Sequence, residues 1–396
     1  MALRMKKKIQ NLMLIFVSMS LMLLVSECIL RVTGVGNMTV SPNTLFRSDR
    51  DVGWICTPNV NERHFKPGSF DVRVICNSHG LRDSEKGYAK PPETWRIGIL
   101  GDSYAWGFGV ENEEMVSTVL QNLIPNAETI NFGVKGYSTL QEVLRLETEG
   151  LRYKPDLTLL FFYHNDLEDN FDDKEMKRPA LIVTNDDVLK IRNRPAQRHY
   201  KSPIKQWFQL NSRVYLLSRY GINLLKSKRK EKRRLGVIKS KHQLANVPSP
   251  NKKNAGKIEF SLAEIYAPPT INIERAWKAM SLLLARARNL AATDGGRLVV
   301  VYVAAKEAMD NEVFTTEMEK AGFDPDSELL DWDRPSNNLG QICATLDIPY
   351  VNLTPVFRRH PKPFSLFLKK DGHWSTAGHQ LAAEIVAARI EPFRKQ

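Results

Sequence analysis

The stretch WRIGILGDS, residues 95–103, decides the fold class of this chain. Its apolar run ends in Gly101 and is typical of a strand buried on both faces of a parallel sheet. Two similar runs follow, ETINFG (Glu128–Gly133) and DLTLLFFY (Asp156–Tyr163). Helical patterns separate the runs, over Glu113–Leu123 and Leu140–Leu151. Because strands and helices alternate, the sequence predicts an α/β fold built on a parallel sheet.

The alternation stops after residue 166 and returns near residue 274. Two further strands are predicted, RLVVVYVAA (Arg297–Ala305) and IPYVNL (Ile348–Leu353). Helices are predicted over Glu274–Thr293, Asn337–Leu346 and Thr376–Ile390. The predicted core therefore spans residues 91–166 and 270–396, interrupted by an insertion at 167–269. Residues 40–90 carry short alternating apolar runs such as FDVRVIC (Phe70–Cys76) and predict a small β-rich lead-in.

The composition of the 396 residues, 42% apolar and 26% charged, excludes a disordered chain, a small disulfide scaffold and a multi-span membrane protein. The formal net charge of +13 is concentrated in residues 1–11 and in the run KSKRKEKRRLGVIKSK, residues 226–241. Elsewhere basic and acidic residues are nearly balanced, which argues against a nucleic-acid partner. The basic run is a solvated loop or a contact for anionic lipid headgroups or an acidic polysaccharide.

Residues 12–30, LMLIFVSMSLMLLVSECIL, are mostly apolar, and their one charged residue is Glu27 near the end. A helix of about 20 such residues can cross a bilayer. The lysines before it predict a cytoplasmic tail at 1–11, a membrane signal anchor at 12–30 and an extracytoplasmic body, periplasmic or at the cell surface. A cleaved signal peptide is the main alternative. Lipidation of Cys28 and a buried N-terminal helix are weaker ones.

Two cysteines of the lead-in, Cys56 and Cys76, either pair in an oxidising compartment or stay buried thiols. Cys343 is predicted on a helix face. The sequence has no Cys-x-x-Cys, and its eight histidines show no metal-ligand spacing near acidic residues. It predicts neither a metal site nor a cofactor.

A residue that can offer a hydroxyl, a backbone N–H or a side-chain amide follows each of the first three strands. Ser103 comes directly after the first, Gly136 after the second and Asn165 after the third. The carboxyl ends of parallel strands meet at one sheet edge, where ligands bind. Taken singly, each residue also fits a plain turn or helix cap.

The C-terminal stretch KKDGHWSTAGH, residues 369–379, brings an acid and a base close together. Asp371 and His373 point the same way in extended backbone, so the carboxylate can accept the proton on one imidazole nitrogen. The other nitrogen can then accept a proton from Ser103. His379, in the final helix, is a spare candidate base. Read alone, Asp371 and His373 also fit a helix-capping loop.

The order of these blocks resembles the SGNH (GDSL-type) hydrolase superfamily, in its membrane-anchored bacterial branch. The resemblance covers roughly residues 45–166 and 270–395. It implies a three-layer flavodoxin-like α/β fold and a Ser-His-Asp mechanism on acyl esters. It implies Ser103 as nucleophile, His373 as general base and then acid, and Asp371 as the residue that orients His373. It also implies an oxyanion hole made of the N–H groups of Ser103 and Gly136 and the side-chain amide of Asn165.

The sequence departs from the family pattern at two places. Tyr163 stands where the family commonly has the glycine of Gly-x-Asn-Asp. The last block is Asp-x-His-Trp, Asp371–Trp374, where the family commonly has Asp-x-x-His. The shorter form resembles the membrane-tethered branch and the polysaccharide O-acetyltransferases related to alginate acetylation.

Three functions are compatible with the sequence. The first is a serine ester hydrolase of the cell envelope that removes an acyl group, in the first instance acetyl, from a glycan or lipid. The second is an O-acetyltransferase for an exported polysaccharide, with a membrane protein as acyl donor and a sugar hydroxyl in place of water. The third is a catalytically idle glycan-binding protein. The insertion is a candidate lid, while the substrate and the oligomeric state stay open.

Overall fold

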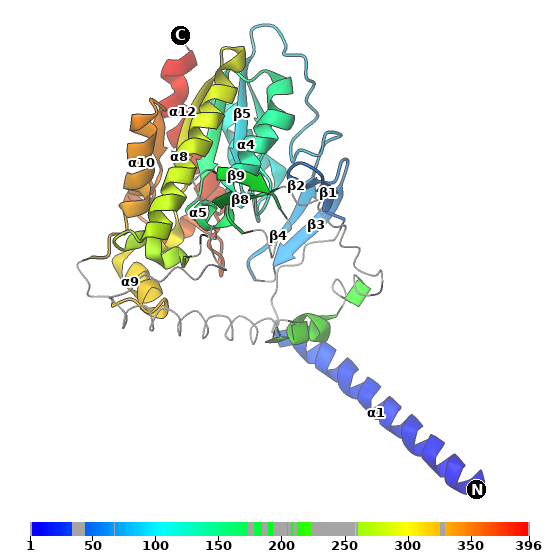
Figure 1. The fold of residues 1–396 in the computed structure, drawn as a ribbon. Helices are drawn as coiled ribbons and strands as arrows, with labels where there is room; N and C mark the ends of the chain where they lie inside the picture. The colour runs from blue at the N-terminus through cyan, green and yellow to red at the C-terminus, as the bar shows by residue number, and fades with distance from the viewer. Residues whose placement is uncertain are drawn as a thin grey trace. The chain divides into compact units, whose positions relative to one another are not determined.

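A computed structural model describes residues 2–33, 44–66, 68–172, 178–183, 189–192, 204, 207–208, 212–219, 221–222, 258, 260–324 and 329–394. The chain divides into two compact units. One comprises Met1–Asn43, His64–Asp71 and Tyr200–Val247. The other comprises Thr44–Arg63, Val72–His199 and Pro248–Gln396, and it holds the predicted sheet and every predicted site residue (Figure 1).

The larger unit is built on a five-stranded sheet in the order β11-β10-β7-β5-β6. All neighbouring strands pair in parallel. The strands are β5 (Trp95–Gly101), β6 (Ala127–Asn131), β7 (Leu157–Phe162), β10 (Arg297–Tyr302) and β11 (Tyr350–Asn352). Each lies inside or within one residue of a predicted strand, so the five apolar runs are confirmed.

Helices cover both faces of the sheet, giving three layers. Strand β7 is buried throughout and shows why: Leu157, Leu159 and Phe161 enter one apolar cluster, while Leu160 and Phe162 enter the other. The cluster on one face includes residues of α4 (Thr139–Thr148), α8 (Ile271–Ala291), α9 (Asn311–Lys320) and α10 (Arg334–Thr345) (Figure 1). The cluster on the other face includes residues of α3 (Val116–Leu123), α11 (Thr354–Arg359) and α12 (Thr376–Arg394). This is the predicted three-layer α/β fold.

The five predicted helices are present with shifted ends. The predicted start at Glu113 belongs to a separate 3-10 turn, Asn112–Glu114, and Leu151 to another, Gly150–Tyr153. Helix α9 was missed. It begins after Asp310, whose carboxylate accepts hydrogen bonds from the N–H groups of Glu312 and Val313. Only Phe314 and Met318 of this helix are buried, so its apolar pattern is weak.

The predicted insertion leaves and rejoins the fold between two neighbouring strands, because β10 pairs directly with β7. Its described ends contribute to the core through Leu181, Ile258 and Phe260. The hairpin β8 (Ala180–Val183) with β9 (Leu189–Arg192) lies in the first of these ends. The basic run 226–241 lies outside the described residues, and so does the stretch 247–257.

The lead-in is β-rich, as the sequence predicts. Strands β1 (Phe46–Asp49) and β2 (Gly53–Cys56) form one two-stranded sheet, and β3 (Asn61–Lys66) and β4 (Phe70–Ile75) form another. A disulfide joins Cys56 to Cys76, whose Cα atoms are 6.5 Å apart. This settles the two open readings in favour of pairing. Cys343 is buried in α10 as a free thiol, as predicted.

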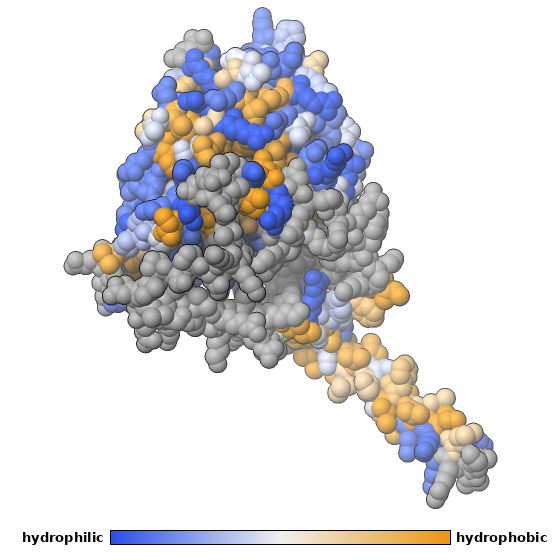
Figure 2. All heavy atoms as spheres, viewed as in Figure 1, coloured by the Kyte–Doolittle hydropathy of each residue, from blue (hydrophilic) through white to orange (hydrophobic). Residues whose placement is uncertain are grey.

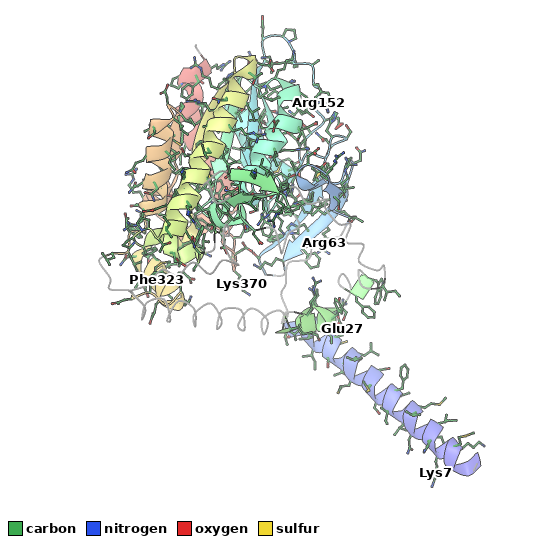
Figure 3. All side chains as sticks on the ribbon, viewed as in Figure 1. Lys7, Glu27, Arg63, Arg152, Phe323 and Lys370 are labelled. Atoms are coloured by element: carbon green, nitrogen blue, oxygen red, sulfur yellow. A yellow bond between two sulfur atoms is a disulfide. The ribbon has the colours of Figure 1, made fainter. Side chains whose placement is uncertain are left out.

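The smaller unit contains α1 (Ala2–Thr33), of which Met5–Thr33 is long and apolar enough to cross a membrane. Its surface is mostly apolar (Figure 2). It can serve as a membrane anchor or as a signal sequence. Glu27 near its end accepts hydrogen bonds from the backbone N–H groups of Arg213 and Val214 at 2.8 and 3.0 Å. Those residues begin a short helix at 213–219 that lies beside the end of α1 (Figure 3).

Candidate active site

Ser103 lies at the turn between β5 and the short helix α2 (Ser103–Trp106). The turn needs glycine at Gly101, because its φ is +155° and a Cβ there would lie 2.7 Å from the Cβ of Ala105. Asp102 caps α2 by accepting the N–H of Tyr104 at 2.9 Å. The turn therefore presents Ser103, 7% exposed, at the carboxyl end of β5, which pairs with the central strand β7.

The structure brings Ser103, His373 and Asp371 into one hydrogen-bonded line. The Oγ of Ser103 lies 2.7 Å from Nε2 of His373. On the other side of the ring, Nδ1 lies 2.6 Å from Oδ1 of Asp371. The same carboxylate oxygen accepts the backbone N–H of His373 at 3.1 Å, which fixes the loop that carries both residues. This arrangement lets the imidazole take the serine proton on one side while the carboxylate holds it on the other.

Aromatic residues hold the His373 ring in place. Phe108 stacks on it at a centroid distance of 4.1 Å, and Tyr104 lies 5.1 Å away. The Tyr104 hydroxyl also donates to the carbonyl of Gly372 at 2.9 Å, and Lys306 Nζ donates to the carbonyl of Asp371 at 3.1 Å. Two hydrogen bonds therefore hold this loop, one from Tyr104 in α2 and one from Lys306. Together with the stacking of Phe108 they fix the position of the His373 ring.

Gly136 lies in the turn after β6, at the same sheet edge as Ser103. The N–H of Tyr137 donates to the carbonyl of Val134 at 3.1 Å, closing a turn in which Gly136 has a φ of +78°. Glycine takes this conformation without strain. The two backbone carbonyls next to the glycine Cα, those of Lys135 and Gly136, each accept a side-chain hydrogen bond. Trp54 Nε1 donates to Lys135 O at 3.1 Å, and an Arg178 guanidinium N–H donates to Gly136 O at 2.9 Å.

Asn165 follows β7 at that edge and begins α5 (Asp166–Asp169). Its Nδ2 donates to Oδ2 of Asp169 at 3.2 Å. Its Oδ1 is buried and has no hydrogen-bond partner among the residues the structure describes. The predicted oxyanion residues thus share an edge with Ser103, and their role there stays a prediction.

Three carboxyl groups of this region are buried, Asp102, Glu142 and Asp166, and Asp102 Oδ2 lies 3.3 Å from Ser103 Oγ. Burial raises the pKa of Asp102 to about 6, against the lowering effect of the Tyr104 N–H and the His373 charge. Burial also raises the pKa of Glu142 and of Asp166 well above their ordinary values. Thr139 donates to Asp166 at 3.1 Å. In both groups burial therefore favours the protonated form.

His379, the spare candidate base, lies in the interior instead. It is 1% exposed, and its Nδ1 accepts the backbone N–H of Val116 at 3.2 Å. Burial lowers the pKa of His379 to about 3, with smaller contributions from Arg82 and His373. A neutral, buried ring that caps the start of α3 has a structural role, and the site is built on His373.

Two residues near the site were missed by sequence reasoning. Arg178 and Asp169 connect Gly136 with Asn165, since Arg178 donates to Asp169 Oδ1 at 2.6 Å as well as to Gly136. Arg178 lies in the predicted insertion, and no motif marks it. Asp169 stands one helical turn after Asn165, which is the only sequence signal that could have pointed to it.

No cluster of three or more histidine, cysteine, aspartate or glutamate side chains suited to a metal occurs among the described residues. The hydrogen-bonded line from Asp371 to Ser103 supplies proton transfer with protein groups alone. The prediction that no cofactor is used stays a prediction.

The three-layer fold and the serine at the carboxyl end of β5 agree with the SGNH-type fold that the sequence resemblance implies. Residues 263–395 match the family model described as SGNH hydrolase-like domain, acetyltransferase AlgX. Residues 263–395 are therefore similar to an SGNH hydrolase-like domain of the AlgX class, in agreement with the resemblance seen in the sequence. This class comprises esterases and acyltransferases. A comparison with curated proteins found no match.

Several solved structures are similar to the chain at low identity. The lipase/acylhydrolase from Enterococcus faecalis is 12% identical, with a TM-score of 0.38, over 75% of this chain and 95% of its own. The esterase EstA from Pseudoalteromonas sp. is 10% identical, with a TM-score of 0.38, over 76% and 100%. An acetyl xylan esterase, AlAXEase, is 12% identical, with a TM-score of 0.37, over 74% and 98%. No functional conclusion rests on these similarities.

Proposed function

We propose that this protein is a Ser103-dependent enzyme of the cell envelope that acts on acyl esters, in the first instance acetyl esters of a glycan or lipid. The observation that carries the proposal is the line from Ser103 Oγ to His373 Nε2, 2.7 Å, and from His373 Nδ1 to Asp371, 2.6 Å. Both distances are within the range for proton transfer through hydrogen bonds.

In the first half-reaction, His373 Nε2 takes the proton of Ser103 as Oγ bonds to the acyl carbon. Asp371 stabilises the imidazolium that forms. The carbonyl oxygen becomes an oxyanion, and the N–H groups of Ser103, Gly136 and Asn165 are its proposed donors. The ester bond then breaks, His373 returns the proton to the leaving alcohol, and the acyl group stays on Ser103.

In the second half-reaction, an acceptor hydroxyl gives its proton to His373 and attacks the acyl carbon. The bond to Ser103 Oγ breaks, and the serine recovers its proton from His373. Water as the acceptor makes the protein an esterase. A sugar hydroxyl as the acceptor makes it an O-acetyltransferase, using the same residues.

Transfer is a second candidate because the matched family model is described as that of an acetyltransferase. The Asp-x-His-Trp form of the last block supports the same branch, and Trp374 is fixed by its indole N–H, which donates to Ala304 O at 3.1 Å. A transferase of this kind would receive its acyl group from a membrane protein. The apolar helix α1 and the lysines before it support an anchor with the enzyme outside the cytoplasm.

The test uses the detergent-solubilised full chain beside its Ser103→Ala variant. Both receive p-nitrophenyl acetate, with and without polysaccharide oligomers, and mass spectrometry follows the acetyl group. We expect Ser103→Ala to lose turnover by about 10⁴-fold or more, because the nucleophile is gone. Thr118→Ala, a hydroxyl variant of α3 away from the site, is the matched control.

Free acetate formed only by the wild type, with or without sugar, would identify an esterase. Acetyl groups on the oligomer would identify a transferase. If the wild type and Ser103→Ala show the same turnover, and Ser103 never carries an acetyl group, the proposal is wrong and a binding role becomes the better explanation.

A further inference from the structure

The two predicted oxyanion residues that lie outside the β5–α2 turn are joined by a continuous set of hydrogen bonds. Asn165 Nδ2 donates to Asp169, and Asp169 accepts a bond of 2.6 Å from Arg178. A second N–H of the same guanidinium donates to Gly136 O at 2.9 Å. One arginine therefore contacts the Gly136 turn directly and the Asn165 amide through one carboxylate.

The burial of Arg178 indicates that these contacts are built into the fold. The side chain is 1% exposed, and its Nε donates to the carbonyl of Asp172 at 3.2 Å. A buried guanidinium is stable only when its donors are satisfied and its charge is paired. Its planar fork suits two acceptors at fixed positions, and lysine has no equivalent geometry.

Holding Gly136 matters because glycine has the greatest freedom to rotate. The Trp54 indole already holds the carbonyl of the peptide that contains the Gly136 N–H. Arg178 holds the next carbonyl. With both peptide planes held, the direction of the Gly136 N–H is set.

Asp169 fixes the orientation of the Asn165 side-chain amide by accepting one of its N–H groups. An amide nitrogen carries two N–H bonds, and Asp169 takes one of them, which fixes the plane of the amide and leaves the other to be aimed elsewhere. Burial raises the pKa of Asp169, and the Arg178 guanidinium opposes that shift. Loss of the arginine would favour a protonated Asp169, which is a poorer acceptor for the amide.

We propose that Arg178 is a positioning residue of the oxyanion hole, which sets the Gly136 peptide directly and the Asn165 amide through Asp169. The inference rests on the proposed function. It assigns to the first part of the insertion a task in catalysis that no motif of the sequence indicates.

The test compares Arg178→Met, Arg178→Lys and Asn165→Ala in the full chain. Arg152→Met is the matched control, because that arginine has a side chain 56% exposed and pairs with Glu149 at 3.1 Å (Figure 3). We measure kcat and KM for p-nitrophenyl acetate, the rate at which a fluorophosphonate labels Ser103, and the melting temperature. In the labelling step Ser103 Oγ bonds to phosphorus, fluoride leaves and His373 takes the serine proton.

We expect Arg178→Met to lower kcat and the labelling rate by about 10²-fold, the size of effect of one lost oxyanion donor, with KM within about twofold. Arg178→Lys should have a kcat and a labelling rate about tenfold higher than those of Arg178→Met. The double variant Arg178→Met/Asn165→Ala should lose about tenfold less than the product of the two single losses, because both changes act on one amide.

A folded Arg178→Met protein with wild-type kcat would overturn the inference, and so would fully additive losses in the double variant. If Arg178→Met fails to fold, Arg178→Lys and Asp169→Asn carry the same comparison. An inactive wild type whose Ser103 is not labelled would instead refute the proposed function, so the two failures are distinguishable.

Discussion

The loop 371–373 and the interior around Asp102 hold the same kinds of titratable groups in different surroundings. In the loop, Asp371 and His373 have side chains 13% and 25% exposed and are hydrogen-bonded to each other. In the interior, Asp102 and Glu142 are almost fully buried, and burial raises the pKa of each. The residue types are alike, so burial and pairing decide which groups can move protons.

The interior histidine follows the same rule. His379 stands six residues after His373 in the sequence, yet burial lowers its pKa to about 3 and its Nδ1 is occupied by the Val116 N–H. Proton transfer at neutral pH needs a group that can take and return a proton near that pH. The comparison therefore separates a hydrogen-bonded loop from an interior in which burial favours the uncharged form of each group.

The largest effect is expected in the loop. Asp371→Asn should lower kcat by about 10⁴-fold, because an amide can donate to Nδ1 and leave the imidazole in the tautomer that cannot accept the serine proton. Steady-state kinetics with p-nitrophenyl acetate measure it. Glu142→Gln, the same kind of change in the interior, should alter kcat by less than about threefold. Equal losses of kcat in Asp371→Asn and Glu142→Gln would contradict the difference between the loop and the interior.

The next effect concerns His379 and acid stability. Its folded-state pKa lies below the ordinary value of 6.5, so between pH 6.5 and about 3 the unfolded chain binds a proton that the folded chain does not. This group therefore lowers the free energy of unfolding by about 1.4 kcal/mol for each pH unit of acidification in that range. In His379→Asn, whose amide can still accept the Val116 N–H, the decline should be shallower.

Urea unfolding of both proteins at pH 7, 5.5 and 4.5 measures the difference. His360→Asn is the control, because it makes the same substitution at a half-buried histidine whose Nδ1 likewise accepts a backbone N–H, that of Lys362, at 3.1 Å. Parallel curves for wild type and His379→Asn would show that His379 takes up a proton in the folded protein, contrary to its buried environment.

The smallest effect is expected at Asp102. Its folded-state pKa of about 6 lies above the ordinary value of 3.8, so the folded chain holds the proton longer. Its ionisation therefore lowers stability as the pH rises from about 3.8 to 6, and the loss is complete above that. Asp102→Asn, which keeps the acceptor for Tyr104, should be more stable than wild type by about 3 kcal/mol at pH 7.5 and by nothing near pH 3.5. Thermal melts at both values test this, and an equal shift at both would refute it.

Much of the fold could be predicted because its strands are buried on both faces. Runs such as residues 157–162 and 297–302 are almost continuously apolar, so they are easily recognised as buried strands. Their alternation with helices along the chain predicts a parallel sheet. Helix α9 could not be predicted, because only Phe314 and Met318 of its residues are buried. The hairpin β8–β9 was missed because it lies inside a stretch judged to be an insertion.

The site could be predicted only in part. Ser103, Asp371 and His373 lie in short motifs with fixed spacing, and the structure brings them within hydrogen-bonding distance. Arg178 could not be predicted, because its neighbour Gly136 lies far away in sequence and contributes only a backbone carbonyl. Every residue has a backbone carbonyl, so the residue type at position 136 does not indicate such a contact. The same is true of Trp54 and Lys135.

The carboxylate of Glu27 has a consequence for the order in which the chain is made. Its hydrogen-bonding partners, Ser212, Arg213 and Val214, are synthesised about 185 residues later. The first turn of the helix at 213–219 thus depends on an acceptor that left the ribosome near the start of translation. A protease that removed the first 30 residues would leave these donors to water. Cleavage after α1 would therefore remove the one carboxylate that three donors of this turn share.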